Sequence, residues 1–210
     1  MVVTRDLKIG QEKIVVPIDA GFEHLADWLL GVFLKMHQAG SLMADGKRVQ
    51  LGWSTLVLRR QQDMTLLVYE PNFMNDPLTE EMPGATYTLK VQSAQVEFAD
   101  RAKVTPLVTA FQEKIVIERG CLSSNKIYMS RVTPSRENND SGWFIGAQKC
   151  VGIASDSEAD VELDAIYAFE LLRARPALLP TLILPSEFMV MVEGDGIVGV
   201  INANNETVMY

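Results

Sequence analysis

Residues that commonly carry out catalysis or bind metals are scarce in this sequence. It contains two cysteines and two histidines among 210 residues. Cys121 and Cys150 do not form a C-x-x-C pair, so neither a zinc site nor a disulfide-rich scaffold is expected. His24 and His37 lie on one expected helix at a spacing that points them to different faces, which excludes an i, i+4 metal pair.

Catalytic motifs are missing as well. The sequence has no G-x-S-x-G motif, no histidine outside that helix to activate a serine or cysteine, and no glycine-rich phosphate loop of either standard type. We therefore expect a protein that is not an enzyme, with no catalytic residues, no metal site and no cofactor.

Long apolar runs and an excess of basic residues are also missing. No run approaches the roughly 18 apolar residues that span a membrane, and residues 1–10 lack the apolar core of a signal peptide. We expect a cytoplasmic protein with free thiols and no membrane partner. The 19 Lys and Arg residues against 27 Asp and Glu residues give a net charge of −8. Such a chain repels phosphate backbones, so we expect no nucleic-acid partner either.

What is present is an ordinary globular composition, with 48% hydrophobic and 22% charged residues. Apolar residues recur at helical spacing through 21–38, up to Gly40, and predict the main helix. Short runs rich in β-branched residues predict strands at 13–18, 48–60 and 64–70. These patterns indicate an α+β fold with mostly antiparallel sheets.

The rest of the chain is predicted to consist of short elements. Thr105 before Pro106 is typical of a helix start, which predicts a short helix to Phe111. Further strands are expected at 86–91, 113–120, 126–131 and 143–146, further helices at 94–103 and 165–174, and a hairpin around "GDG" over 187–201. Because the composition changes near 120–124, two domains are expected, at 1–120 and 121–210.

One segment, "SDSEADVELD" at 155–164, has an unusual charge pattern. Its carboxylates occupy alternate positions, and it contains no Lys or Arg. If the segment is extended, all of these carboxylates point the same way, because side chains of a strand alternate between faces. The set, which we term the acidic row, consists of Asp156, Glu158, Asp160, Glu162 and Asp164.

The acidic row has three interpretations. A calcium loop of the EF-hand type would place glycine at position 6 and glutamate at position 12, but counting from Asp156 these positions hold Val161 and Tyr167. A solvated acidic edge is the second interpretation. The third, which we adopt as the prediction, is a docking surface for a basic partner protein, because Lys or Arg side chains would relieve the repulsion within the row.

The second half of the chain combines several motifs in a fixed order. The strand "IYMSR" ends at Arg131, "DSGW" follows at 140–143, and then come the acidic row, a proline-rich segment and the final hairpin. This order resembles the Imm33-like family of immunity proteins over residues 122–203. The chain departs from the family pattern after the tryptophan, where "GAQK" at 146–149 stands in place of the usual G-x-E. The matching residues are Arg131, Asp140, Ser141, Gly142, Trp143, the acidic row, Pro176, Pro180 and Pro185.

Members of that family look like antidotes in bacterial toxin systems. The resemblance implies a non-enzymatic protein that binds and blocks a co-encoded toxin. The toxin we expect is a nuclease effector of a type VI or contact-dependent secretion system, since nuclease active sites are basic. The alternative is a calcium-binding or general regulatory protein-interaction module. Within the D-S-G-W motif, Trp143 is expected to be buried, with Asp140 and Ser141 shaping the turn before it.

Overall fold

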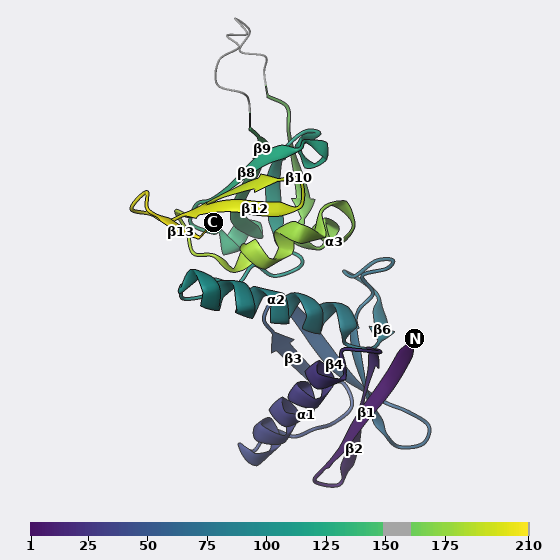
Figure 1. The fold of residues 1–210 in the computed structure, drawn as a ribbon. Helices are drawn as coiled ribbons and strands as arrows, with labels where there is room; N and C mark the ends of the chain where they lie inside the picture. Colours follow the sequence, from purple (N-terminus) through teal and green to yellow (C-terminus); the bar gives the residue numbers. More distant parts are fainter. Residues whose placement is uncertain (149–160, 210) are drawn as a thin grey trace, which may run out of the picture. The chain divides into compact units, whose positions relative to one another are not determined.

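The computed structural model describes residues 1–148 and 161–209, and the chain folds into two compact units (Figure 1). The first unit is Met1–Ser93 and the second is Ala94–Tyr210. Each unit contains its own sheet and its own helical elements. The α+β class expected from the sequence is therefore confirmed.

The sheet of the first unit has the strand order β1-β2-β5-β4-β3, with β6 paired to β5. Neighbouring strands are antiparallel, except that β2 and β5 run parallel. The expected strand at 48–60 is in fact two strands, β3 and β4, joined by a turn at Gly52, whose φ is 54°. The strands are β1 (Val2–Ile9), β2 (Glu12–Asp19), β3 (Arg48–Leu51), β4 (Ser54–Arg60), β5 (Leu66–Pro71) and β6 (Glu81–Pro83).

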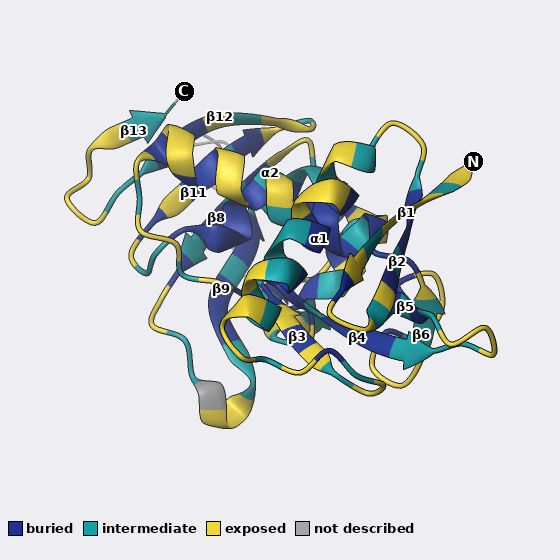
Figure 2. Ribbon diagram, turned by 90° about the horizontal axis from the view of Figure 1, so that it is seen from below, coloured by how far each residue is buried: buried dark blue, intermediate teal, exposed yellow. Residues whose placement is uncertain are grey.

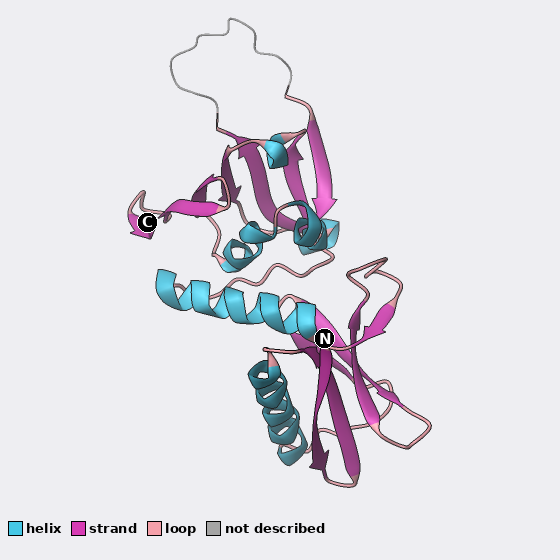
Figure 3. Ribbon diagram, turned by 45° about the vertical axis from the view of Figure 1, so that its right-hand side comes forward, coloured by secondary structure: helices cyan, strands magenta, loops and turns pink. Residues whose placement is uncertain are grey.

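The main helix, α1 (Glu23–Gln38), confirms the prediction for 21–38 and lies against β1 and β2 (Figure 3). Its buried side chains recur every three to four residues, which places them on one face. They pack into the core formed by alternate residues of the central strands. This core includes Ile14, Val16, Ala26, Leu29, Phe33, Leu58, Leu66 and Val68.

A second helix, α2 (Thr86–Ala102), corrects one prediction. Residues 86–91 were expected to form a strand because Thr, Tyr and Val favour strands, but they form the start of α2. The buried carboxylate of Glu70 accepts hydrogen bonds from the backbone N–H groups of Tyr87 and Thr88, at 3.2 and 2.7 Å. A tertiary contact therefore satisfies the first turn and overrides the local preference. The division between the units, after Ser93, falls inside this helix.

The sheet of the second unit has the strand order β10-β7-β9-β8-β11-β12-β13. β7 lies between β10 and β9, so residues 114–118 belong to the second unit, although the expected boundary at residue 120 assigned them to the first. The hairpin expected over 187–201 is confirmed. The strands are β7 (Lys114–Glu118), β8 (Lys126–Arg131), β9 (Asp140–Ala147), β10 (Leu163–Tyr167), β11 (Met189–Glu193), β12 (Gly196–Ile201) and β13 (Thr207–Met209).

Two helix predictions in the second unit are wrong. The expected helix at 165–174 begins as strand β10, because residues 163–167 pair with β7, and only residues 168–174 form helical turns. No helix forms in the described backbone at 105–111, where Leu107 N instead donates to Ile183 O at 2.8 Å. The short helical elements are η1 (Cys121–Ser123), η2 (Arg136–Asn138), η3 (Ala168–Glu170), α3 (Leu171–Ala174) and η4 (Pro176–Ile183).

Buried residues concentrate on the strands and on the inner faces of the helices in each unit (Figure 2). In the second unit, the core combines inward residues of β7, β8, β9 and β11 with apolar side chains of η4. Its most deeply buried members include Ile115, Ile127, Met129, Trp143, Ile145, Leu178, Leu182 and Val190. Within the described residues, no helix has the length and apolar character needed to cross a bilayer.

Candidate partner-binding site

Two members of the acidic row lie where β10 begins: Glu162 directly precedes this strand and Asp164 is its second residue. Asp156, Glu158 and Asp160 lie outside the described residues. β10 pairs with β7 and, within the described part of the chain, is an edge strand of its sheet. Both described carboxylates are exposed.

Arg119, directly after β7, forms ion pairs with both of these carboxylates. Its Nη1 contacts Glu162 Oε2, and its Nε donates to Asp164 Oδ2 at 3.0 Å. The backbone fixes this arrangement, because Arg119 N also donates to Glu162 O at 2.8 Å. The hydrogen bond and the charge of Arg119 hold the pKa of Asp164 below its usual range, and Asp164 in turn raises the pKa of Arg119. This end of the row therefore already has a cationic partner within the protein.

The pairing with Arg119 was not expected from the sequence, although a signal existed. Arg119 lies near the end of the predicted strand at 113–120, and an antiparallel neighbour there would bring it opposite the row. Charged side chains on an edge strand also discourage pairing with other chains. Asp164 therefore has a structural interpretation that does not require a binding partner. Whether the row binds a partner stays a prediction.

The D-S-G-W motif forms the start of β9. Asp140 Oδ1 accepts a hydrogen bond from Gly142 N at 2.9 Å, which is an Asx turn. Ser141 Oγ accepts from Trp143 N at 3.2 Å and donates to Lys114 O on β7 at 2.6 Å. Gly142 has a φ of 75°, and a Cβ there would lie 2.2 Å from Val132 O. The motif is thus a turn that only glycine can complete.

Behind this turn, Trp143 and Arg131 form a buried pair. Trp143 is 1% exposed and Arg131 is also 1% exposed, with the guanidinium 5.4 Å from the ring centroid. Arg131 Nε donates to Ser141 O, Nη1 donates to three backbone carbonyls, and Nη2 donates to Thr109 Oγ1. Burial lowers the pKa of Arg131 to about 10, so the side chain stays charged at neutral pH. The strand-ending arginine therefore ties β8 to β9, to residues 107–109 and to η4.

This turn and its buried arginine lie within a recognised domain. A family model described as the Imm33-like domain matches residues 94–203, just over half of the chain. The chain belongs to the Imm33-like family. The name is that of an immunity protein family, as the resemblance of the sequence implied. No match was found among curated proteins or among solved structures.

The Imm33-like match extends further than the motifs visible in the sequence. It begins at residue 94, where the second unit begins, rather than at residue 122. The match therefore includes β7, Arg119 and the loop at 107–109 that holds Arg131. These residues complete the sheet and the arginine site of the Imm33-like domain, which explains why they belong to it.

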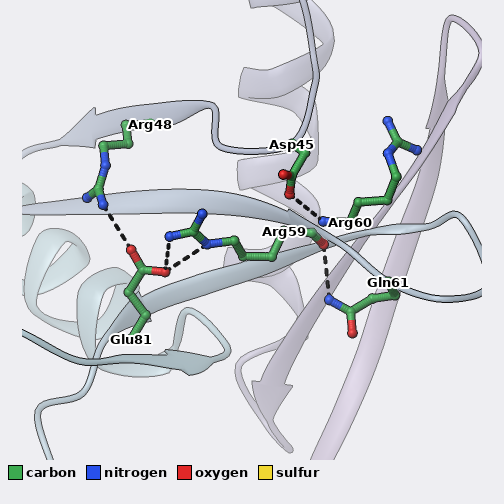
Figure 4. Close-up of polar contacts among 6 residues, drawn as sticks. All are labelled: Asp45, Arg48, Arg59, Arg60, Gln61 and Glu81. Atoms are coloured by element: carbon green, nitrogen blue, oxygen red, sulfur yellow. Dashed lines mark hydrogen bonds and ion pairs between the residues drawn. The ribbon is translucent and has the colours of Figure 1, made fainter.

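The first unit lies outside the Imm33-like match and carries its own charged cluster (Figure 4). Glu81 accepts hydrogen bonds from Arg48 at 3.0 Å and from Arg59 at 2.7 Å. Arg60 turns to the other side of the sheet, where it pairs with Glu12 at 2.7 Å. Because Glu81 lies on the short strand β6, which pairs with β5, these ion pairs link β6 to β4 and β3 as well.

Metal-binding groups are not gathered in the described residues, where no three His, Cys, Asp or Glu side chains lie close enough to hold an ion. His24 is exposed on α1, and His37 lies beside the turn at Gly10, where a Cβ would be 3.0 Å from its ring. Cys121 is buried, and burial raises the pKa of its thiol. Cys150 lies outside the described residues.

Proposed function

We propose that this protein is an immunity protein that binds a cognate bacterial toxin and neutralises it in the cytoplasm of the producing cell. The observation that carries the proposal is membership of the Imm33-like family over residues 94–203. An immunity protein acts by occupying a surface of the toxin, so it needs binding residues rather than a catalytic set.

Charge supports a basic toxin, and a nuclease is the class we favour. The second unit, residues 94–210, contains 10 Lys and Arg against 16 Asp and Glu, a net of −6 of the −8 for the whole chain. A nuclease cleft must be basic in order to hold phosphates. An acidic protein is drawn to such a cleft by long-range attraction, which raises the association rate. Delivery of the toxin by a type VI or contact-dependent system is part of this proposal.

The acidic row is the proposed contact surface. Arg119 offsets one of the two charges on Glu162 and Asp164, whereas Asp156, Glu158 and Asp160 add three further negative charges. We therefore assign the larger share of the attraction to these three residues, with Glu162 and Asp164 at the margin of the surface.

The test is co-expression with the product of the neighbouring toxin gene. We expect this chain to restore growth of cells that express the toxin and to co-purify with it. A catalytically inactive toxin should still co-purify, because the proposed mechanism is occupation rather than chemistry. Cells that die despite abundant folded protein, with no complex recovered, would contradict the proposal.

A further inference from the structure

The first unit contains a pocket of about 120 Å³. It is separate from the charged cluster around Glu81 and lies outside the Imm33-like match. It lies at the start of α2, between the end of β2 and the residues that follow β6. Its lining combines hydrogen-bond acceptors with apolar walls. The acceptor side includes Asp19, Glu70, Thr86 and the backbone around Gly84, and the apolar side includes Ile18 and Met82.

Glu70 gives this pocket a buried carboxyl group. The residue is 1% exposed. Its hydrogen bonds come from neutral donors at the start of α2, among them the N–H groups of Tyr87 and Thr88 at 3.2 and 2.7 Å, and no ion pair involves it among the described residues. Burial raises its pKa to about 7 despite these bonds. A carboxylate that is desolvated and lacks a cation gains more from an added cation than an exposed one does.

The geometry leaves the carboxylate open to the pocket. Gly84, a lining residue with a φ of 133°, has no side chain, and a Cβ there would lie 3.8 Å from Glu70 Oε1 and 3.5 Å from Pro17 O. Oε1 is also the less strongly bonded oxygen of Glu70, at 3.2 Å from its donor. Asp19, half-buried at the same pocket, supplies a second carboxylate.

These features suit a primary ammonium group. A primary ammonium has three N–H donors and no acceptor, which suits a site made of two carboxylates and a carbonyl. The apolar walls suit a methylene chain, as a lysine stem requires.

We propose that the Asp19–Glu70 pocket receives a primary ammonium group, supplied by a lysine side chain of the bound protein partner. The ammonium contacts Glu70 Oε1 and the Asp19 carboxylate, and the lysine stem lies along Met82. The source of the lysine rests on the function proposed above, whereas the chemistry of the pocket does not. The first unit thereby contributes a specific contact in addition to the acidic surface of the second.

The pocket is tested on the full chain with ethylammonium chloride as the probe, without any toxin. The apparent pKa of Glu70, measured from its side-chain carboxyl ¹³C shift, should fall by about one unit or more when ethylammonium binds, as expected for an opposite charge within 4–6 Å. Sodium chloride and tetramethylammonium chloride at equal ionic strength should leave it unchanged, since neither offers an N–H donor. Asp19 and Tyr87 are the other titratable residues at this pocket, so Asp19 is followed in the same spectra.

The variant Asp19→Asn should weaken the ethylammonium effect, whereas Asp6→Asn, on the exposed edge strand β1, should not. An equal response to all three salts would overturn the proposal for the pocket and would leave the immunity function untouched. The toxin arm then tests the source: Asp19→Asn should weaken toxin binding about threefold to tenfold. Toxin binding equal to the wild type, with a pocket that still responds to ethylammonium, would show that the ammonium does not come from the toxin.

Discussion

Gly142 occupies a backbone position that a side chain cannot enter. Its φ is 75°, and a Cβ would lie 2.2 Å from Val132 O. Gly120 has a similar φ of 79° but nothing within 4 Å of its Cβ position. Gly120→Ala should therefore cost about 1–2 kcal/mol from backbone strain alone, and Gly142→Ala should cost clearly more. Urea unfolding of both variants measures the difference. Equal losses of stability would mean that the backbone at Val132 can shift to accommodate the added Cβ at little cost.

Trp143 fills the space behind that turn, and its removal should leave a large cavity. Trp143→Ala is expected to lower the free energy of unfolding by about 3–5 kcal/mol. Trp143→Phe should cost less, because it keeps most of the ring and removes an indole N–H that has no acceptor among the described residues. Thermal melts of both variants check the order. If Trp143→Ala melted like the parent protein yet lost its partner, the ring would be a binding residue instead.

Glu70 should make stability depend on pH near neutrality. Burial raises its pKa from the usual 4.5 to about 7, so between these values the folded protein holds a proton that the unfolded chain has released. The contribution of Glu70 to stability is thus fully present below pH about 4.5 and is lost as the pH rises through about 7. The loss is on the order of 3 kcal/mol. Denaturant unfolding from pH 5 to pH 8 measures it, and Glu70→Gln should flatten the profile. A profile unchanged by Glu70→Gln would assign the dependence to other groups.

At the scale of the elements, the sequence predicted correctly those helices and strands that local residue patterns determine. It failed for segments whose structure depends on contacts with another part of the chain. Local periodicity and turn residues were sufficient to predict the helix at 21–38, the strand at 126–131 and the hairpin over 187–201. Residues 86–91 have strand-like composition but become helical because Glu70, distant in sequence, caps their first turn. Residues 163–167 become a strand because β7 pairs with them. The intrinsic propensity of a segment carries no information about either of these tertiary contacts.

The candidate site shows the same limit. The alternation of the acidic row is visible in the sequence, and Asp140 to Trp143 form the expected turn. The pairing of Glu162 and Asp164 with Arg119 depends on the strand order of the sheet, which the sequence does not reveal. The five acceptors of Arg131 come from three separate segments of the chain, so the sequence does not reveal them either.

Arg131 should be the most sensitive link between these elements. Its planar fork reaches carbonyls on β9, on residue 107 and at the end of η4. Arg131→Lys keeps the charge but cannot reach this set, and buried carbonyls lose their donors, so we expect a loss of about 3 kcal/mol or more. Arg119→Lys, at an exposed ion pair, is the matched control and should change stability little. Chemical unfolding compares the free energies of unfolding of the two variants. Similarly small losses would mean that other donors replace the Arg131 guanidinium at these carbonyls.

At the scale of the whole molecule, charge and family membership converge on the second unit. It contains the Imm33-like match, the acidic row and −6 of the net charge, whereas the first unit has 9 Lys and Arg against 11 Asp and Glu. The first unit is instead rich in internal ion pairs, such as those of Glu81 with Arg48 and Arg59. We therefore expect long-range attraction to come from the second unit and any contribution of the first to come from short-range contacts.

The acidic row should control how fast the partner binds. Replacing Asp156, Glu158 and Asp160 with Asn, Gln and Asn removes three charges and should slow association with the cognate toxin, most strongly at low salt, where screening is weakest. Arg119→Gln acts in the opposite sense, because it leaves Glu162 and Asp164 without their cation, and it should speed association. The control variant replaces Glu97, Asp100 and Asp195, which are exposed elsewhere in the same unit, with Gln, Asn and Asn. Stopped-flow association rates across a range of ionic strengths compare the four proteins. If the two triple variants slow association equally, net charge alone steers the encounter and the acidic row is a solvated edge.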